Sequence, residues 1–167
     1  LRRLDVRFHP ESGALVAGLP TRVYAELTLP SGRQSAASGR IVDDRGDAVA
    51  TFDADDGGRT RFALTPLLGR SYRMEFDSPQ VAAVDLPAMS PDGVVLESTQ
   101  DSFEPGEPIR VRVRSTAERS FTVALFCRGV LVAHQDVERT TAADVALTPP
   151  AEIAGVLRVG VFDPLRA

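Results

Sequence analysis

The sequence predicts an all-β protein built from two tandem antiparallel β-sandwiches. Three observations support this fold class: apolar and polar residues alternate with a period of two, turn signals recur at short intervals, and a proline-punctuated stretch lies near the middle of the chain. Strands that bury one face and expose the other to water show this alternation. No window of helical length carries a 3.6-residue apolar stripe, so helices are not expected.

Four stretches show the alternation most clearly, and their apolar residues are expected to point into a core. The first two stretches lie in the first half of the chain and the other two in the second half. These apolar positions are Val23, Ala25, Leu27 and Leu29; Tyr72, Met74 and Phe76; Ile109, Val111 and Val113; and Leu157, Val159 and Val161.

The turn signals and the prolines predict how the chain is divided. Segments rich in Gly, Pro and Asp recur about every eight to twelve residues, which is typical of a sandwich. The stretch 86–91 contains two prolines and lacks alternation. We therefore expect one domain over 1–88 and a second over 89–167, each near the size of a small immunoglobulin-like sandwich.

Composition excludes several classes of function. The net charge of −4 and the pI near 5.2 argue against a nucleic-acid-binding surface. No apolar run approaches membrane-spanning length, so this chain is not expected to insert into a membrane. Cys127 is the one cysteine, which excludes an internal disulfide and a multi-cysteine zinc site. No cofactor is expected, and both ends of the sequence suggest a piece cut from a longer protein.

Several motifs together resemble the macroglobulin-like domains of large bacterial envelope proteins, which are related to the N-terminal region of alpha-2-macroglobulin. The motifs are "FHPESGALVAGLPTRVYAEL", "GRIVDDRGDAVATF" and "GRTRFALTPLLGRSY" in the first half, and "SFEPGEPIRVRV" in the second. Their recurring Gly and Pro residues have backbone roles, so the resemblance concerns fold more than function.

The resemblance implies tandem macroglobulin-type sandwiches that serve as structural modules of a secreted, periplasmic or outer-envelope protein. The implied partners are neighbouring domains of the same parent chain, with another protein as a further candidate. Some relatives trap proteases through a Cys-Gly-Glu-Gln thioester, but here Cys127 precedes Arg128-Gly129-Val130, which removes that chemistry. We therefore expect a non-catalytic structural and interaction module. The alternative is an accessory or carbohydrate-binding sandwich attached to an envelope enzyme, against which the absence of Trp counts.

Two acidic turns are candidate sites. Arg45-Gly46-Asp47 matches a tripeptide that adhesion receptors recognise, but a short hairpin turn between two strands is sufficient to explain it. Asp53, Asp55 and Asp56 resemble a calcium loop, yet position 12 of that loop would be Leu64 rather than a bidentate acid. No metal site is therefore expected, although calcium held with the help of Asp43 or Asp44 stays open as an alternative.

Cys127 and His134 are the remaining candidates for nucleophile and base. If Arg128-Gly129 forms a two-residue turn, His134 lies opposite Val123, and about 13 Å of strand separates it from the thiol. A catalytic dyad is therefore not expected, and Cys127 is interpreted as a small core residue. No catalytic residue is predicted.

The most specific candidate for partner binding is the row of Arg110, Arg112 and Arg114 on one strand face. Guanidinium groups about 6.6 Å apart could bind a polyanion or an acidic protein surface. The alternative is a solvated face on which the arginines pair with acids of neighbouring strands, such as Glu118 or Glu138.

Overall fold

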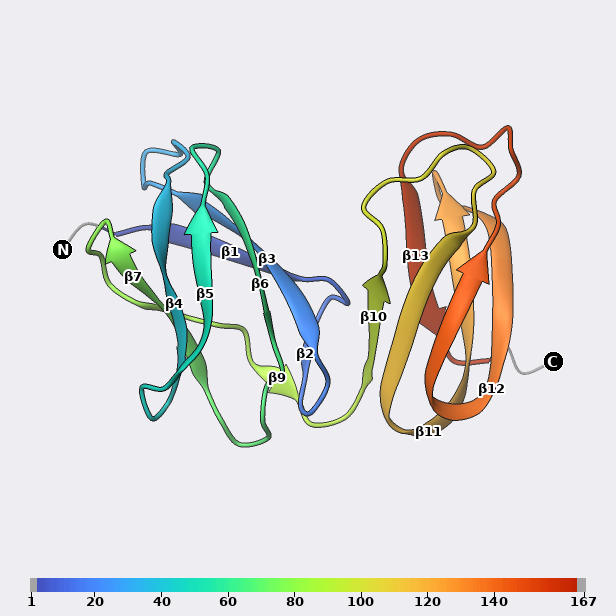
Figure 1. The fold of residues 1–167 in the computed structure, drawn as a ribbon, viewed down its shortest axis with the longest axis horizontal. Helices are drawn as coiled ribbons and strands as arrows, with labels where there is room; N and C mark the ends of the chain where they lie inside the picture. Colours follow the sequence, from blue (N-terminus) through green and yellow to red (C-terminus); the bar gives the residue numbers. More distant parts are fainter. Residues whose placement is uncertain (1–2, 165–167) are drawn as a thin grey trace. The chain divides into compact units, whose positions relative to one another are not determined.

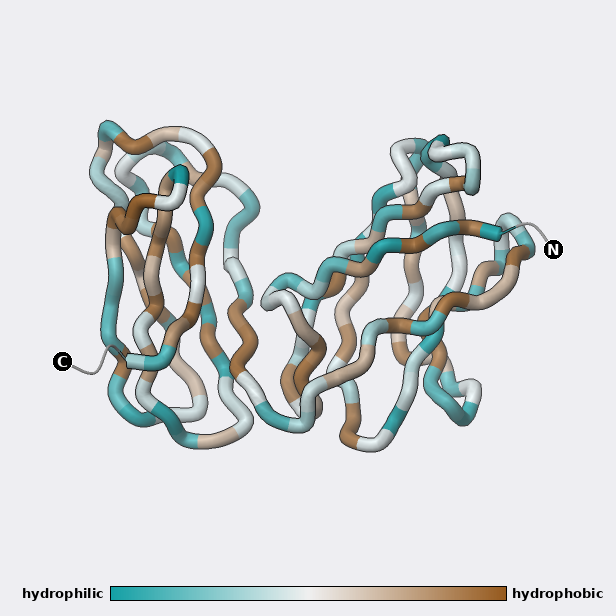
Figure 2. The backbone as a smooth tube through the Cα atoms, turned by 180° about the vertical axis from the view of Figure 1, so that it is seen from behind, coloured by the Kyte–Doolittle hydropathy of each residue, from teal (hydrophilic) through white to brown (hydrophobic). Residues whose placement is uncertain are grey.

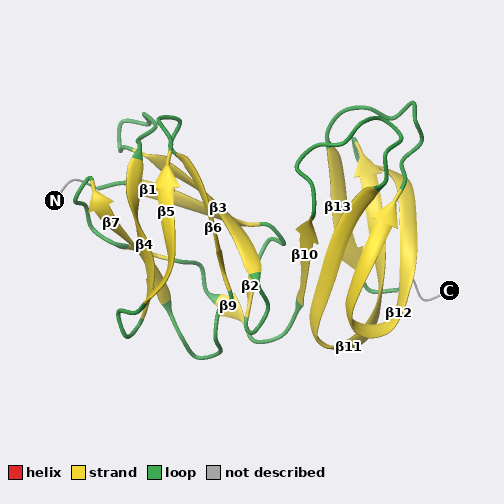
Figure 3. Cartoon of the chain, in the orientation of Figure 1, coloured by secondary structure: helices red, strands yellow, loops and turns green. Residues whose placement is uncertain are grey.

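The computed structural model describes residues 3–164 and contains strands and connecting loops, with no helix in that range (Figure 3). The prediction of an all-β protein is confirmed. Within the described residues, no helix is long and apolar enough to cross a membrane. All the larger sheets are antiparallel. Two strands of two residues each pair with one another in parallel.

The chain forms two compact units, one ending at Pro91 and the other beginning at Asp92. The sequence pattern places residues 89 and 90 in the second domain. In the structure, Met89 and Ser90 pair with Leu15 and Val16 and therefore belong to the first unit. The stretch 86–91 thus belongs to the first unit, and the chain enters the second unit after Pro91.

The first unit contains two antiparallel sheets and the short parallel pair (Figure 1). One sheet has the order β1-β3-β6, the other has the order β5-β4-β7-β8, and β2 pairs with β9. The strands are β1 Asp5–Pro10, β2 Leu15–Val16, β3 Thr21–Thr28, β4 Ala37–Asp43, β5 Ala48–Ala54, β6 Arg59–Leu64, β7 Tyr72–Ser78, β8 Val84–Asp85 and β9 Met89–Ser90.

The core of the first unit forms from the alternating residues of these strands, and Figure 2 shows hydrophobic and hydrophilic residues alternating along the chain. Val23, Ala25 and Leu27 of β3 and Met74 of β7 have at most 1% of their surface exposed. Tyr72 and Phe76 are also buried, as predicted, and Leu29 packs at the edge of the same cluster.

The second unit is a single antiparallel sheet of four strands, two of which are long. Strand β11 pairs with β12 along most of its length, with β10 near its beginning and with β13 near its end. The strands are β10 Val94–Ser98, β11 Ile109–Cys127, β12 Val130–Leu147 and β13 Leu157–Phe162.

Strands β11 and β12 bend, so that their two halves form opposite sides of one core. Register shifts between Arg114 and Phe121 interrupt the pairing at the bend. Residues from both halves of β11, including Val113 and Val123, then belong to the same buried cluster. Val111 and Val113 are buried as predicted, and Val159 packs partly buried against the cluster.

Candidate functional site

The second half of β11 has mostly apolar residues on both of its faces, whereas the predicted strands have one apolar and one polar face. Its inward residues Phe121, Val123 and Leu125 are fully buried in the core. Its outward residues Thr122 and Ala124 are also buried. The outer face of this half of the unit therefore carries apolar residues as well as polar ones.

This surface consists of three rows that cross β12, β11 and β13, and we call it the outer strip. The strand registers place the members of each row directly opposite one another, so that they share a face. From the β11–β12 turn onward, the rows are Leu131, Phe126 and Arg158; His134, Ala124 and Gly160; and Asp136, Thr122 and Phe162.

Large apolar side chains of this region remain exposed to water. The exposed fraction is 50% for Leu131, 45% for Phe162 and 65% for Val130 in the neighbouring turn. Val156, just before β13, is 89% exposed. Single exposed apolar residues are ordinary, but a contiguous group on one face marks a surface suited to binding.

Two aromatic rings form the centre of the strip. The centroids of Phe126 and Phe162 lie 5.8 Å apart, and the ring planes meet at 70°, an edge-to-face arrangement. The ring of Phe162 lies over Gly160, where an added Cβ would come within 2.8 Å of it. Glycine at this position therefore lets the ring approach the backbone of β13 closely.

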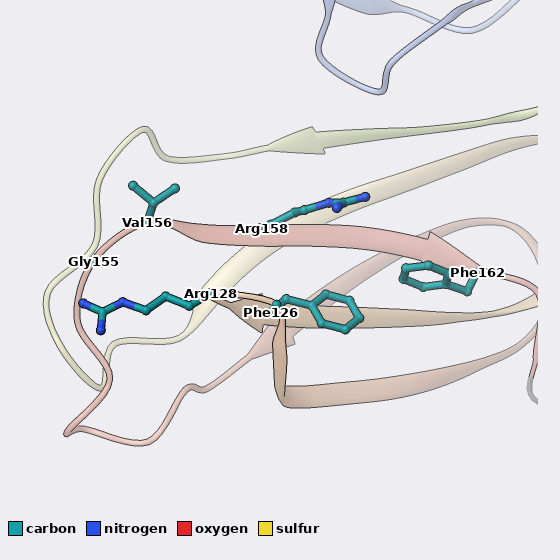
Figure 4. A pocket seen from close by; sticks show the side chains of 7 residues that line it. Phe126, Arg128, Gly155, Val156, Arg158 and Phe162 are labelled. Atoms are coloured by element: carbon teal, nitrogen blue, oxygen red, sulfur yellow. The ribbon is translucent and has the colours of Figure 1, made fainter.

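The strip has cavities on its surface and opposite charges at its two ends. A cavity of about 750 Å³ is lined by Phe126, Phe162, Arg128 and Arg158 together with the loop around Val156 (Figure 4). A second, of about 410 Å³, extends over Ala124 and Leu131 toward His134 and Asp163. No described residue forms an ion pair with Arg128 or Arg158.

The acidic end of the strip is formed by Asp136 and Asp163. The hydroxyl of Thr122 donates a hydrogen bond to Asp136 at 2.5 Å, and this bond fixes the position of the carboxylate. Asp163 follows β13 and lines the smaller cavity. The basic groups thus lie at one end of the strip and the acidic groups at the other.

The structure places Cys127 and His134 on opposite faces of the sheet. Leu125 pairs with Ala133, but Phe126 pairs with Leu131, so Val132 is an extra residue in β12. This bulge moves His134 opposite Ala124, and the expected pairing with Val123 is wrong. Arg128 and Gly129 both have positive φ, as a two-residue hairpin turn requires, and Cys127 is buried.

The arginine row occupies a different surface, on the first half of β11. Arg112 pairs with Asp144 at 2.7 Å, and Arg114 pairs with Glu97 at 3.2 Å. The hydrogen bond from Arg112 to Asp144 also raises the pKa of Arg112 above its ordinary value. No described residue pairs with the side chain of Arg110.

The acidic partners that the sequence suggested for this row are wrong. Glu118 pairs instead with Arg139 at 3.3 Å, and Glu138 makes no ion pair with the row among the described residues. Residues 115–119 lie in the bend of β11, which carries Glu118 away from the arginines. Because Arg112 and Arg114 pair with acids of neighbouring strands, the row has less unpaired positive charge for binding a polyanion than the sequence pattern indicated.

Arg45-Gly46-Asp47 lies in the turn between β4 and β5, as the hairpin interpretation predicted. One carboxylate oxygen of the buried Asp43 accepts hydrogen bonds from the backbone N–H groups of Arg45, at 2.9 Å, and of Asp47, at 3.0 Å. Arg70 donates to both Asp43 and Asp44, which ties the turn to the β6–β7 loop. The bond from Arg70 lowers the pKa of Asp44 below its ordinary value.

The three acids considered for calcium lie at the connection between β5 and β6. The Asp55 carboxylate accepts the backbone N–H of Arg59 at 2.9 Å, so it is used in closing the hairpin. Among the described residues, no group of three or more His, Cys, Asp or Glu side chains is arranged to hold a metal ion. Asp53, Asp55 and Asp56 are thus placed as hairpin residues.

Comparisons with known proteins give no family assignment. No protein-family model matches the sequence, and no curated protein matches it. Three solved structures are similar over 96% of this chain: "Biofilm associated protein - BSP domain" (17% identity, TM-score 0.37), Salmonella alpha-2-macroglobulin reacted with methylamine (8%, 0.33) and E. coli alpha-2-macroglobulin in its native conformation (10%, 0.32). The matched region spans 27%, 15% and 12% of those chains. TM-scores this low do not establish a shared fold.

Sequence reasoning missed the outer strip because it considered only one face of each strand. The signal was nevertheless present: residues 121–127, FTVALFC, contain a single polar residue. A continuous apolar run of this length indicates a strand covered on both faces. In the described structure, other side chains cover the outward face of this run only in part. The run therefore indicates a surface suited to binding.

Proposed function

We propose that this chain is a non-catalytic structural and interaction module of a larger exported bacterial protein of the alpha-2-macroglobulin type, made of immunoglobulin-like sandwiches. The observation that carries the interaction role is the outer strip, where Phe126, Leu131 and Phe162 form an apolar surface on an antiparallel sheet. The macroglobulin-like motifs of the sequence support the parent class and its export.

The chemistry of the described residues supports a role without catalysis. A nucleophile and its base must lie within hydrogen-bond reach, whereas Cys127 and His134 occupy opposite faces of a sheet. His9, the other histidine, lies 3.9 Å from the exposed Glu26 on the surface of the first unit. Neither arrangement brings together the groups that hydrolysis requires.

Carbohydrate binding is the second candidate, because Phe162 is a half-exposed aromatic residue on a sheet face. A sugar ring stacks on a flat aromatic platform. The planes of Phe126 and Phe162 meet at 70°, so the two rings do not form one platform. The geometry therefore favours a protein surface as partner.

Activity assays test the proposed function. The purified chain is incubated with a panel of endopeptidases and with chromogenic ester and glycoside substrates. We expect no turnover and no stoichiometric inhibition of any protease. Turnover that is lost in Cys127→Ala or His134→Ala, or one-to-one inhibition of a protease, would contradict the non-catalytic role.

A further inference from the structure

We propose that the outer strip binds the outer strip of a second copy of this chain, turned end for end. The inference rests on the proposed interaction role and names the partner of that surface. It follows from the order of charges along the strip, which is complementary to itself when reversed. An interface in which both subunits use the same patch has to meet this condition.

The charge order follows from the strand registers. Arg158 lies in the first row of the strip, and Arg128 lies just beyond it in the β11–β12 turn. Asp136 lies in the third row, and Asp163 lies just beyond it after β13. Phe126 and Leu131 lie beside the basic groups in the first row, and Phe162 lies beside the acidic groups in the third.

A two-fold axis that crosses the strands at Ala124 and Gly160 places the basic end of each copy opposite the acidic end of the other. It inverts the order of the rows while keeping β13 over β13. Arg158 then faces the end of β13 in the second copy, where Asp163 lies, and Arg128 faces the end that contains Asp136. Any parallel arrangement would instead place the arginines of the two copies together, which is unfavourable.

The shape of the strip supports the same arrangement. The middle row has only Ala124 and Gly160 on β11 and β13, and the rings of Phe126 and Phe162 meet above it, with their centroids 5.8 Å apart. After the rotation, Phe162 of one copy lies over Phe126 and Arg158 of the other. An aromatic ring contacting a ring edge and a guanidinium is a favourable pairing.

The size of the strip limits the expected affinity. Three strands about 4.8 Å apart and three rows about 6.6 Å apart give a face smaller than the roughly 800 Å² per partner of a stable complex. Charge pairs at the rim mainly fix orientation. We therefore expect a weak dimer with a Kd on the order of 10–100 μM.

Sedimentation equilibrium of the whole chain tests the proposal, at protein concentrations from about 1 μM to 1 mM. The buffer is kept at one pH of about 8 in every measurement, above the ordinary pKa range of histidine side chains. The variants are Arg158→Glu and Asp163→Arg, which change exposed residues and should leave the fold intact. Each variant alone should dimerise at least tenfold more weakly, because like charges then meet at both symmetric contacts.

An equimolar mixture of the two variants gives the decisive result. In the mixed dimer, the glutamate introduced in one variant faces the arginine introduced in the other at one contact. The native Arg158 and Asp163 face each other at the second contact, so association should return to the wild-type level. Arg110→Glu is the matched control, since Arg110 is exposed and unpaired among the described residues but lies outside the strip. It should not change the Kd.

Three results would overturn the proposal. The wild-type chain could stay monomeric at every concentration, or the mixture of variants could fail to restore association. Alternatively, Arg110→Glu could abolish a dimer that Arg158→Glu leaves intact, which would assign the interface to the arginine row. None of these results affects the activity assays, so failure of the dimer and failure of the non-catalytic role are distinguishable.

Discussion

Gly39 shows how a single residue can be required by close backbone packing. It lies in the middle of β4, where a Cβ would come within 2.0 Å of the Glu75 backbone oxygen and 2.9 Å of the Phe52 ring. A register shift between β4 and β7 adjoins the same position. The backbone of β7 cannot withdraw without breaking its pairing, so the site excludes any side chain.

Gly39→Ala should therefore lower the free energy of unfolding by about 1–3 kcal/mol, as overpacking does in other cores. Gly57→Ala is the control, because the nearest atom to its Cβ is a side-chain oxygen of Asp55 at 3.1 Å, which has to give way by only a few tenths of an ångström. Urea denaturation measures both variants. Equal effects of the two substitutions would show that the close contact with Glu75 is not the cause.

Arg70 makes the stability of the β4–β5 turn depend on pH. Its hydrogen bond lowers the pKa of Asp44, so the folded state favours the charged carboxylate more than the unfolded state does. Such a group stabilises the fold above its unfolded pKa of about 3.9, and the contribution is lost as pH falls through the folded pKa.

Arg70→Gln should therefore be less stable than the wild type at pH 7, and the difference should shrink below about pH 4. The urea midpoint at several pH values measures the effect. Arg45→Gln, in the same turn, is the control and should show little pH dependence, because Arg45 is exposed and makes no ion pair with a described residue. A difference for Arg70→Gln that is as large at pH 3 as at pH 7 would contradict the role of Asp44.

At the scale of the strand, successive residues in the second half of β11 point to opposite faces. One set packs in the core and the other lies on the outer strip. Leu125→Ala should cost about 2–5 kcal/mol, because Leu125 is fully buried in the second core. Leu131→Ala, on the facing strand, should cost no more than about 0.5 kcal/mol, because that side chain is half exposed. Denaturation curves that show similar losses for both would contradict the assignment of the two faces.

Much of the strand-level structure could be predicted, because alternation reports directly on burial. The spacing alone places Val23, Met74 and Val113 in cores, and each is fully buried. The turn at Arg128-Gly129 also follows from local chemistry, since a left-handed conformation favours glycine. These features depend on residues close together in the sequence.

The remaining features depend on pairing between distant strands. The extra residue Val132 moves every later residue of β12 relative to β11, and nothing in its local sequence marks it as a bulge. The registers of β10 and β12 on β11 likewise place Glu97 and Asp144, rather than Glu118, at the arginine row. The outer strip combines residues of three strands, so its charge order appears only once the registers are known.

At the scale of the whole molecule, the two units have separate hydrophobic cores, and each should unfold as its own cooperative transition. Met74→Ala should lower the Tm of one transition and Val113→Ala that of the other, because each residue is fully buried in its own cluster. Differential scanning calorimetry measures both. A single transition that either substitution lowers equally would contradict two independent units.

The central claim is that the outer strip is a contact surface, and hydroxyl-radical footprinting at increasing protein concentration tests it most directly. Leu68, which is 69% exposed in the first unit, serves as the exposed control, and the buried Phe52 serves as the protected one. We predict that oxidation of Phe162 and Leu131 falls as concentration rises into the range where the dimer forms, while oxidation of Leu68 stays constant. Oxidation of Phe162 that is the same at every concentration would contradict the claim.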